Sequence, residues 1–233
     1  MDNKSFIEQI EDIYSHTSIY FNSNADNYWS KPKSLNGQIG FCILYTAPSY
    51  NPDILIIGQN PSNFNQTNEM SDEDMYMMSG RIPEINSYLQ HNHKFALKIR
   101  EVFSSESDKQ YLQKSVGMNI WYAQGSKLDQ VKMTEDLKDM KEFCKKQTFK
   151  MINILRPKTI FSIGFKVFDE LNNKDKHKDT LKFGKYRIYE EGELGNIPVY
   201  GCAHLTGAYI PDEPLLDGAR QCLLNIKEYL NDA

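Results

Sequence analysis

Three short polar segments hold the side chains of this chain that are suited to chemistry. Gln59 and Asn60 follow an apolar run at residues 54–57, Asn119 lies within a second apolar run, and His204 follows a third. Amide side chains offer both a donor and an acceptor, and histidine donates or accepts near neutral pH. Taken singly, such residues are more often structural than catalytic, so the interpretation depends on a fold that brings them together.

The apolar run at residues 54–57 predicts a strand buried on both faces, as in a parallel sheet. Gly58 and Pro61 predict a tight turn at its carboxyl end. Further strands are predicted at 38–45, 115–122, 158–164, 186–190 and 197–200, and helices at 2–15, within 85–103, and at 134–155, 165–171 and 217–232. Open α/β sheets bind ligands at the carboxyl ends of their strands, where these polar segments fall.

The alternation of strands and helices predicts an α/β protein, a three-layer α/β/α sandwich with a largely parallel central sheet. The 233 residues suit a single α/β domain. In this interpretation residues 1–50 are an N-terminal helical or irregular extension, and residues 51–233 are the core.

The composition is that of an ordinary globular protein, with 40% hydrophobic and 25% charged residues. No apolar run approaches the roughly 20 residues of a membrane span, and the first residues lack the apolar core of a signal peptide. These features predict a cytoplasmic protein. The four cysteines are scattered without a C-x-x-C pair, so we expect reduced thiols and no metal or other cofactor.

The net charge of −4 means that binding to nucleic acid requires a local basic face. Two clusters of basic residues are candidates: Lys141, Lys145, Lys146 and Lys150, and the run at 174–187 with Lys174, Lys176, Lys178, Lys182, Lys185 and Arg187. Taken alone, each cluster is more typical of a solvated surface than of a binding site.

Together and in this order, the polar segments resemble the motifs of the uracil-DNA glycosylase superfamily. That family has a first motif of the form G-Q-D-P-Y or G-x-N-P-G, an asparagine on a middle strand, and a late motif of the form H-P-S. The counterparts are Gly58-Gln59-Asn60-Pro61-Ser62, Asn119, and His204-Leu205-Thr206. The segment at 155–164 also resembles a core strand of the family. The resemblance covers about residues 50–230, and it implies a uracil-DNA glycosylase-like fold.

The resemblance implies a DNA partner whose pyrimidine nucleotide is flipped into a pocket. It makes Asn60, which would orient the attacking water, and His204, which would stabilise the departing base, the catalytic residues. The implied base-binding residues are Gln59, Ser62, Phe64 and Asn119. The implied DNA-binding residues are Thr206, Tyr209 and Ile210. No lysine in the motifs would form a Schiff base, so the resemblance implies a monofunctional enzyme, without a metal, that we expect to be a monomer.

Two positions depart from the family in ways that affect specificity. Ser62 stands where one branch has a tyrosine that blocks bulk at the pyrimidine C5, so we expect a roomier pocket that accepts C5-substituted bases. Leu205 and Thr206 replace the proline and serine of H-P-S, and threonine keeps the hydroxyl that in the family contacts a phosphate. The amide of Asn119 matches uracil in one orientation and cytosine in the other, so the sequence does not name the base.

The sequence is compatible with three functions. The first is a glycosylase that leaves an abasic site, in DNA repair or in defence against foreign DNA with modified bases. The second is a protein of the same fold that binds nucleic acid or a nucleotide without cleaving it, which Asn60 in place of aspartate and the acidic net charge favour. The third is a hydrolase of free nucleosides or nucleotides.

Overall fold

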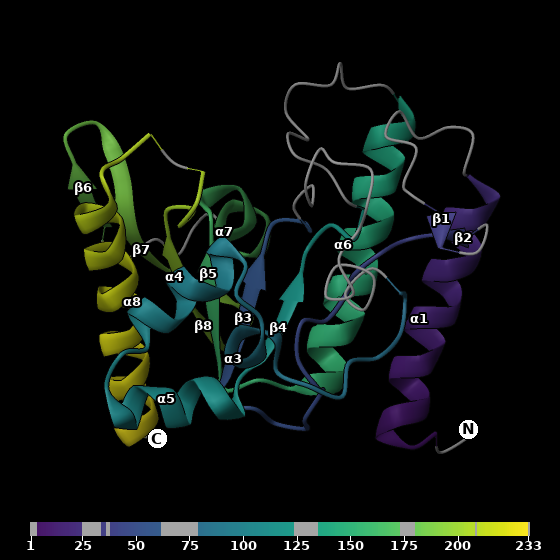
Figure 1. Cartoon of the computed structure of the whole chain (residues 1–233), viewed down its shortest axis with the longest axis horizontal. Coiled ribbons are helices and arrows are strands. Elements are labelled where there is room, and N and C mark those ends of the chain that lie inside the picture. The colour runs from purple at the N-terminus through teal and green to yellow at the C-terminus, as the bar shows by residue number, and fades with distance from the viewer. Residues whose placement is uncertain are drawn as a thin grey trace.

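A computed structural model describes residues 4–24, 34–35, 38–61, 79–123, 135–172, 180–207 and 209–232. These residues form an α/β structure around a six-stranded sheet (Figure 1). The sheet contains β3 (Ile54–Gly58), β4 (Val116–Asn119), β5 (Thr159–Ile163), β6 (Thr180–Phe183), β7 (Tyr186–Leu194) and β8 (Ile197–Cys202). The helices are α1 (Phe6–Ser23), α3 (Ser87–Gln90), α4 (Lys94–Val102), α5 (Glu106–Lys114), α6 (Glu135–Leu155), α7 (Phe165–Leu171) and α8 (Asp212–Asp232). A separate pair of short strands, β1 (Ser34–Leu35) and β2 (Gln38–Ile39), is antiparallel.

The strand order is β4-β3-β5-β8-β7-β6. The first four strands are mutually parallel, whereas β7 and β6 are antiparallel to their neighbours. The carboxyl ends of β4, β3, β5 and β8 therefore meet at one edge of the sheet. The prediction of an α/β fold with a largely parallel sheet is confirmed.

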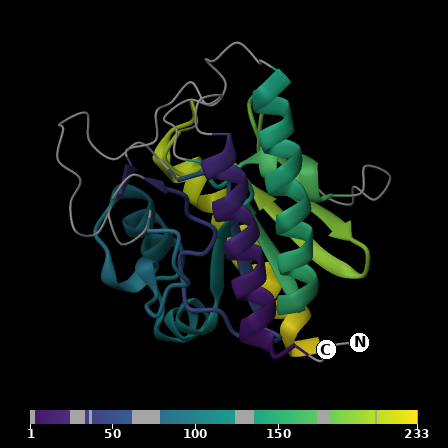
Figure 2. The same ribbon diagram turned by 90° about the vertical axis from the view of Figure 1, so that its right-hand side faces the viewer.

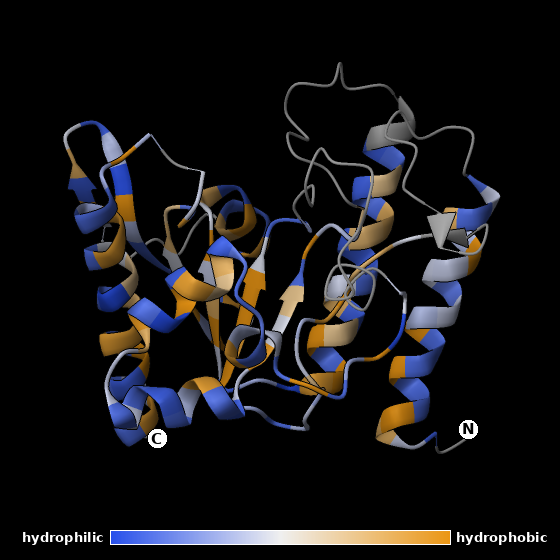
Figure 3. Ribbon diagram, in the orientation of Figure 1, coloured by the Kyte–Doolittle hydropathy of each residue, from blue (hydrophilic) through white to orange (hydrophobic). Residues whose placement is uncertain are grey.

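The core lies on both faces of the sheet, and β3 shows why. Leu55 and Ile57 belong to a cluster with α1, α6 and α7, while Ile54 and Ile56 belong to a cluster with α4, α5 and α8. All four side chains are fully buried, and each stabilises the fold by about 1.5–3 kcal/mol. Figure 3 shows β3 in the hydrophobic colour and the exposed helix α5 mostly in the hydrophilic colour. The uninterrupted apolar run follows from burial on both faces, as the sequence predicts.

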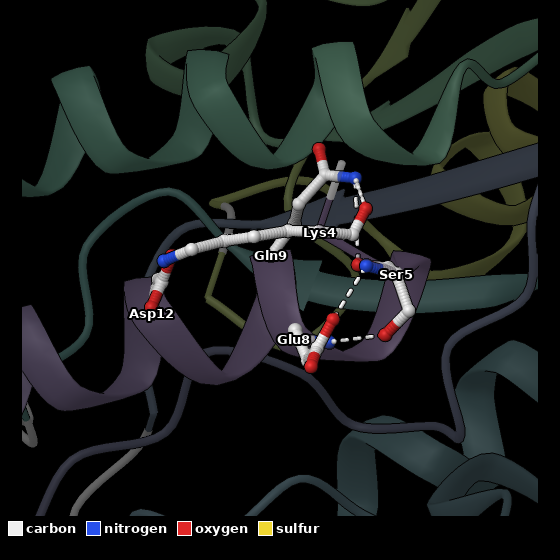
Figure 4. Close-up of polar contacts among 5 residues, drawn as sticks. All are labelled: Lys4, Ser5, Glu8, Gln9 and Asp12. Atoms are coloured by element: carbon white, nitrogen blue, oxygen red, sulfur yellow. Dashed lines mark hydrogen bonds and ion pairs between the residues drawn. The ribbon is translucent and has the colours of Figure 1, made fainter. Parts of the chain in front are cut away.

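Helix α1 begins with a capping box (Figure 4). The hydroxyl of Ser5 accepts from the backbone N–H of Glu8 at 3.3 Å, and the carboxylate of Glu8 accepts from the N–H of Ser5 at 2.6 Å. The helix packs beside α6 (Figure 2), where the rings of Tyr20 and Phe143 stack with centroids 3.8 Å apart. Ile10 is fully buried in this contact. The N-terminal segment therefore contributes to the main core.

The structure differs from the sequence-based expectations at several elements. The strand expected at 38–45 is regular only at Gln38–Ile39, and the chain beyond it makes isolated bridges, among them one from Leu44 to Met118 of β4. Helix α1 extends to Ser23, and α8 begins at Asp212 instead of 217. Helix α5 and strand β6 were not expected, because α5 buries only Leu112 and β6 is exposed along its length. Residues 63–78 and 173–179, for which no regular element is predicted, lie outside the described residues.

None of the helices in the described residues combines the length and the apolar character that crossing a membrane requires.

The turn after β5 depends on Gly164. Its φ is +100°, and its N–H donates to the carbonyl of Cys202 at 2.8 Å, which joins this turn to the end of β8. A Cβ at this position would lie 3.6 Å from the ring of His204. A backbone of this kind is adopted almost only by glycine.

We therefore expect Gly164→Ala to lower the free energy of unfolding by about 1–3 kcal/mol, measured by urea denaturation. Gly195→Ala is the matched control, because Gly195 also has a positive φ, +61°, but faces open space. It is expected to cost only about 1 kcal/mol. Equal losses in the two variants would contradict a special requirement at Gly164.

Candidate active site at the carboxyl edge of the sheet

A cavity of about 250 Å³ lies at the carboxyl edge of the parallel strands. Its volume is below the roughly 300–1,000 Å³ of pockets for drug-sized ligands, so it suits a single heterocycle. The lining residues are Tyr45, Gly58, Gln59, Asn60, His93, Lys94, Phe95, Asn119, His204 and Thr206. Five of the residues predicted from the sequence to form a site, Gln59, Asn60, Asn119, His204 and Thr206, are thus brought together.

The turn after β3 is held against the end of β4 by backbone hydrogen bonds. Gly58 pairs with Asn119 in the sheet, and the carbonyls of Gly58 and Gln59 accept from the N–H groups of Ile120 and Trp121, each at 2.9 Å. The amide nitrogen of Asn60 donates to the carbonyl of the next residue, Pro61, at 2.9 Å. This contact points the Nδ2 of Asn60 along the chain and fixes the orientation of its amide.

Asn119 forms a fully buried wall of the cavity. Its Nδ2 donates to the backbone carbonyl of Cys42 at 3.0 Å. A backbone carbonyl only accepts, so this bond determines which end of the amide is nitrogen. The Oδ1 atom is buried and has no hydrogen-bond partner among the described residues. An unsatisfied buried acceptor costs about 1–3 kcal/mol, which a ligand with an N–H donor would recover.

His204 lies two residues beyond the end of β8 and is supported from two sides. Its Nδ1 lies 3.3 Å from the N–H and 3.4 Å from the hydroxyl of Thr206, and its ring centroid lies 6.0 Å from that of Phe95. Because Nδ1 accepts a backbone N–H, the proton of the neutral ring is on Nε2. Burial lowers the pKa of His204, so the neutral form is favoured at pH 7.

Another part of the cavity lining comes from the start of α4, which sequence analysis did not assign to the site. The Nδ1 of His93 accepts from the N–H of Ala96 at 3.2 Å and caps the helix, and Phe95 follows in the first turn. Lys98, further along α4, forms ion pairs with Glu101 and with Asp212 at the start of α8. This contact connects the wall of α4 to the segment that leads from His204 into α8.

Tyr45 completes the cavity beside Asn119. Its ring is buried, and its centroid lies 5.8 Å from that of Tyr88. Burial raises the pKa of Tyr45 well above its ordinary value, so the phenol stays protonated and can donate a hydrogen bond.

The remaining predicted site residues are placed elsewhere or not described. Ser62 and Phe64 lie outside the described residues. Tyr209 and Ile210 lie in the segment between His204 and α8, outside the lining of the cavity, and the Tyr209 side chain is 92% exposed. Leu205, where the family motif has proline, is buried among the side chains of the α8 face and anchors this segment.

Comparison with known proteins does not assign the chain to a family. No family model and no curated protein matches this chain. Among the described residues, no cluster of three or more His, Cys, Asp or Glu side chains is arranged to hold a metal ion.

We expect the midpoint of the His204 titration, followed by NMR of its ring protons, to lie below its ordinary value of about 6.5. The unfolded chain then binds more protons than the folded one as the pH falls through that value, so His204 lowers the free energy of unfolding at acid pH but not above neutral pH. The control is the same residue in the urea-unfolded chain. A midpoint in the folded protein equal to or above the unfolded one would contradict the buried, neutral ring.

Proposed function

We propose that this protein is a DNA glycosylase with a uracil-DNA glycosylase-like fold, which hydrolyses the N-glycosidic bond of a flipped-out uracil-type pyrimidine. The observation that carries the proposal is the convergence of Asn60, Asn119 and His204 on one cavity at the carboxyl edge of the sheet. These residues come from the turn after β3, the end of β4 and the segment after β8, in the chain order of the family that their motifs resemble.

The fixed amide of Asn119 favours a uracil-type base over cytosine. Its Oδ1 would accept from the N3–H of uracil, and the second hydrogen of Nδ2 would donate to O4. Cytosine has an acceptor at N3 and a donor at C4, so in the same position it would face acceptor with acceptor and donor with donor. The bond from Nδ2 to Cys42 opposes the flip that would reverse this preference.

His204 is suited to stabilise the leaving base. As the glycosidic bond breaks, its electron pair moves to the pyrimidine, and negative charge develops on the base, including its O2. The Nε2–H of a neutral His204 would donate to that oxygen. A donor aimed at developing charge in a buried site contributes about 3–4 kcal/mol to stabilising the transition state.

Asn60 is suited to position the water. The sugar acquires cationic character at C1′, so the water needs orientation more than deprotonation. The oxygen of the water bonds to C1′, and a proton of the water passes to solvent. The base leaves as the anion and is then protonated. The products are free base and an abasic site. The bond from Nδ2 of Asn60 to Pro61 leaves Oδ1 as the atom that would accept from the water.

Phe95 is the described aromatic residue best placed to stack on the base. It lines the cavity together with His93 and His204, and its ring is tilted by 33° to that of His204. Stacking of a base on an aromatic ring is worth about 1–3 kcal/mol. Tyr209, exposed beside this site, is the proposed wedge that fills the space left by the flipped nucleotide.

We expect His204→Ala to lower the rate of base release from a uracil-containing duplex by about 10²–10³-fold. The measurement is alkaline cleavage at abasic sites, resolved on a gel under single-turnover conditions. His16→Ala removes an exposed histidine on α1 and is expected to leave the rate unchanged. If the wild-type protein binds DNA but releases no base, the alternative of a non-catalytic nucleic-acid-binding protein is supported instead.

We further expect uracil to be released from DNA at least about 10²-fold faster than cytosine, because only uracil pairs with both atoms of the fixed amide. Asn119→Ala should reduce release of uracil and leave that of cytosine as slow as before. Parallel duplexes that differ only in the target base provide the measurement. Equal rates for the two bases in the wild-type protein would contradict the role assigned to Asn119.

A further inference from the structure

The hairpin of β6 and β7 carries basic and aromatic side chains that the cavity does not use. Residues 182–186, here called the hairpin tip, are all exposed, and Phe183 and Tyr186 expose 44% and 40% of their surface. Lys182 and Lys185 form no ion pair with any described residue, and the Nζ of Lys185 lies 5.4 Å from the ring centroid of Tyr186. The tip thus combines unpaired positive charge with exposed rings, a pairing typical of nucleic-acid-binding surfaces.

The register of the sheet places the hairpin tip at the same edge as the cavity. Strand β7 pairs antiparallel with β8, so that Tyr189 lies opposite Cys202 near the end of β8. Tyr186 is three residues beyond Tyr189 in the direction of His204, which corresponds to about 10 Å along the strand. Figure 1 shows the hairpin extending at the end of the sheet opposite α5. The hairpin tip therefore projects beyond the carboxyl end of β8, the end of the sheet at which the cavity lies.

The hairpin has a tight two-residue turn and an irregular pairing below it. Gly184 has a φ of +57° and occupies the first central position of the two-residue turn between Phe183 and Tyr186. The pairing shifts below this turn, because Leu181 pairs with Tyr189 whereas Lys182 pairs with Arg187. Such a bulge bends a strand and redirects its side chains.

The third cation of the hairpin, Arg187, is already neutralised. Its guanidinium forms ion pairs with Asp169 of α7 at 3.0 Å and with Glu190 at 2.7 Å, and it lies 4.3 Å from the ring centroid of Phe165. Arg187 therefore fixes the hairpin to α7. The charge available for an external partner belongs to Lys182 and Lys185.

We propose that the hairpin tip binds the phosphate backbone of the DNA that flanks the nucleotide in the cavity. This proposal rests on the proposed function for the identity of the DNA target. Lys182 and Lys185 contact phosphates, and Phe183 and Tyr186 pack against the sugar or an unstacked base. The tip supplies local positive charge to a protein whose net charge is −4.

A polyanion is a more suitable binding partner for the hairpin tip than a second copy of the chain. A two-fold contact through the edge strand β6 would bring Lys182 close to the same lysine of the second copy, and like charges oppose such a contact. The exposed rings are interleaved with these lysines in sequence and do not form a separate apolar patch.

The test measures binding to a duplex of about 20 base pairs without any target base, by fluorescence anisotropy over a range of salt concentrations. Lys182→Ala/Lys185→Ala is expected to weaken binding by about tenfold or more at 0.1 M salt and to reduce the slope of log K against log salt by about 2, since each phosphate contact contributes about 0.9. Lys109→Ala/Lys114→Ala on α5, with both lysines exposed at the opposite end of the sheet, is the control and should keep the wild-type slope.

The outcomes separate this proposal from the proposed function, because the duplex contains no base to release. Three results would overturn the role of the tip even where uracil is excised. They are an unchanged salt slope in the hairpin variant, an equal loss of slope in the control variant, and no DNA binding by the wild-type protein. Loss of slope in the hairpin variant supports it even where no base is released. Wild-type protein that sediments as a dimer, and hairpin variants that sediment as monomers, would identify the tip as a self-association surface and overturn the proposal.

Discussion

The pairing of Gly58 with Asn119 at the ends of β3 and β4 is the constraint on which the site depends. It places an amide side chain beside a turn that has no side chain at its first position, so the Asn119 carboxamide and the Gln59-Asn60 backbone share one wall. A Cβ at Gly58 would lie 3.7 Å from the Oδ1 of Asn119, which is an ordinary van der Waals contact, so this turn and the acceptor are close neighbours. The next backbone bonds, from Ile120 and Trp121, extend the same register past the strands and keep the turn in place.

Two side chains of the cavity lower the stability of the folded protein. A buried acceptor without a partner among the described residues and a histidine held neutral by burial each work against the folded state. Both side chains line the cavity, although buried polar atoms without a partner among the described residues also occur elsewhere, as in Gln147 and Ser162. Such features at a cavity are common in sites organised for a ligand or a transition state, because the surrounding fold holds them in position.

The sequence predicted the elements whose burial produces a recognisable pattern of apolar residues. It did not predict the elements that lack such a pattern. Strand β3 was predicted because both of its faces are covered, and Asn60, Asn119 and His204 were selected because each follows or ends such a run. Strand β6 was missed because exposure on both faces leaves no alternation. Phe95 falls within the helical pattern predicted at 85–103, and no periodicity distinguishes a side chain that packs in a core from one that lines a cavity. The direction of the Asn119 amide required a partner 77 residues away, the carbonyl of Cys42, which only the tertiary structure identifies.

The walls of the cavity come from residues as far apart in the chain as Tyr45 and Thr206. Contacts of such long sequence separation form late and slowly in folding, because the entropy of closing large loops must be overcome before the contacts stabilise the chain. Nearly every strand of the parallel sheet must be in place before the cavity exists, so no partly folded intermediate or fragment presents half of a working site. Ligand binding at this cavity therefore favours only the completely folded chain, and it would raise the kinetic barrier to unfolding of the whole sheet.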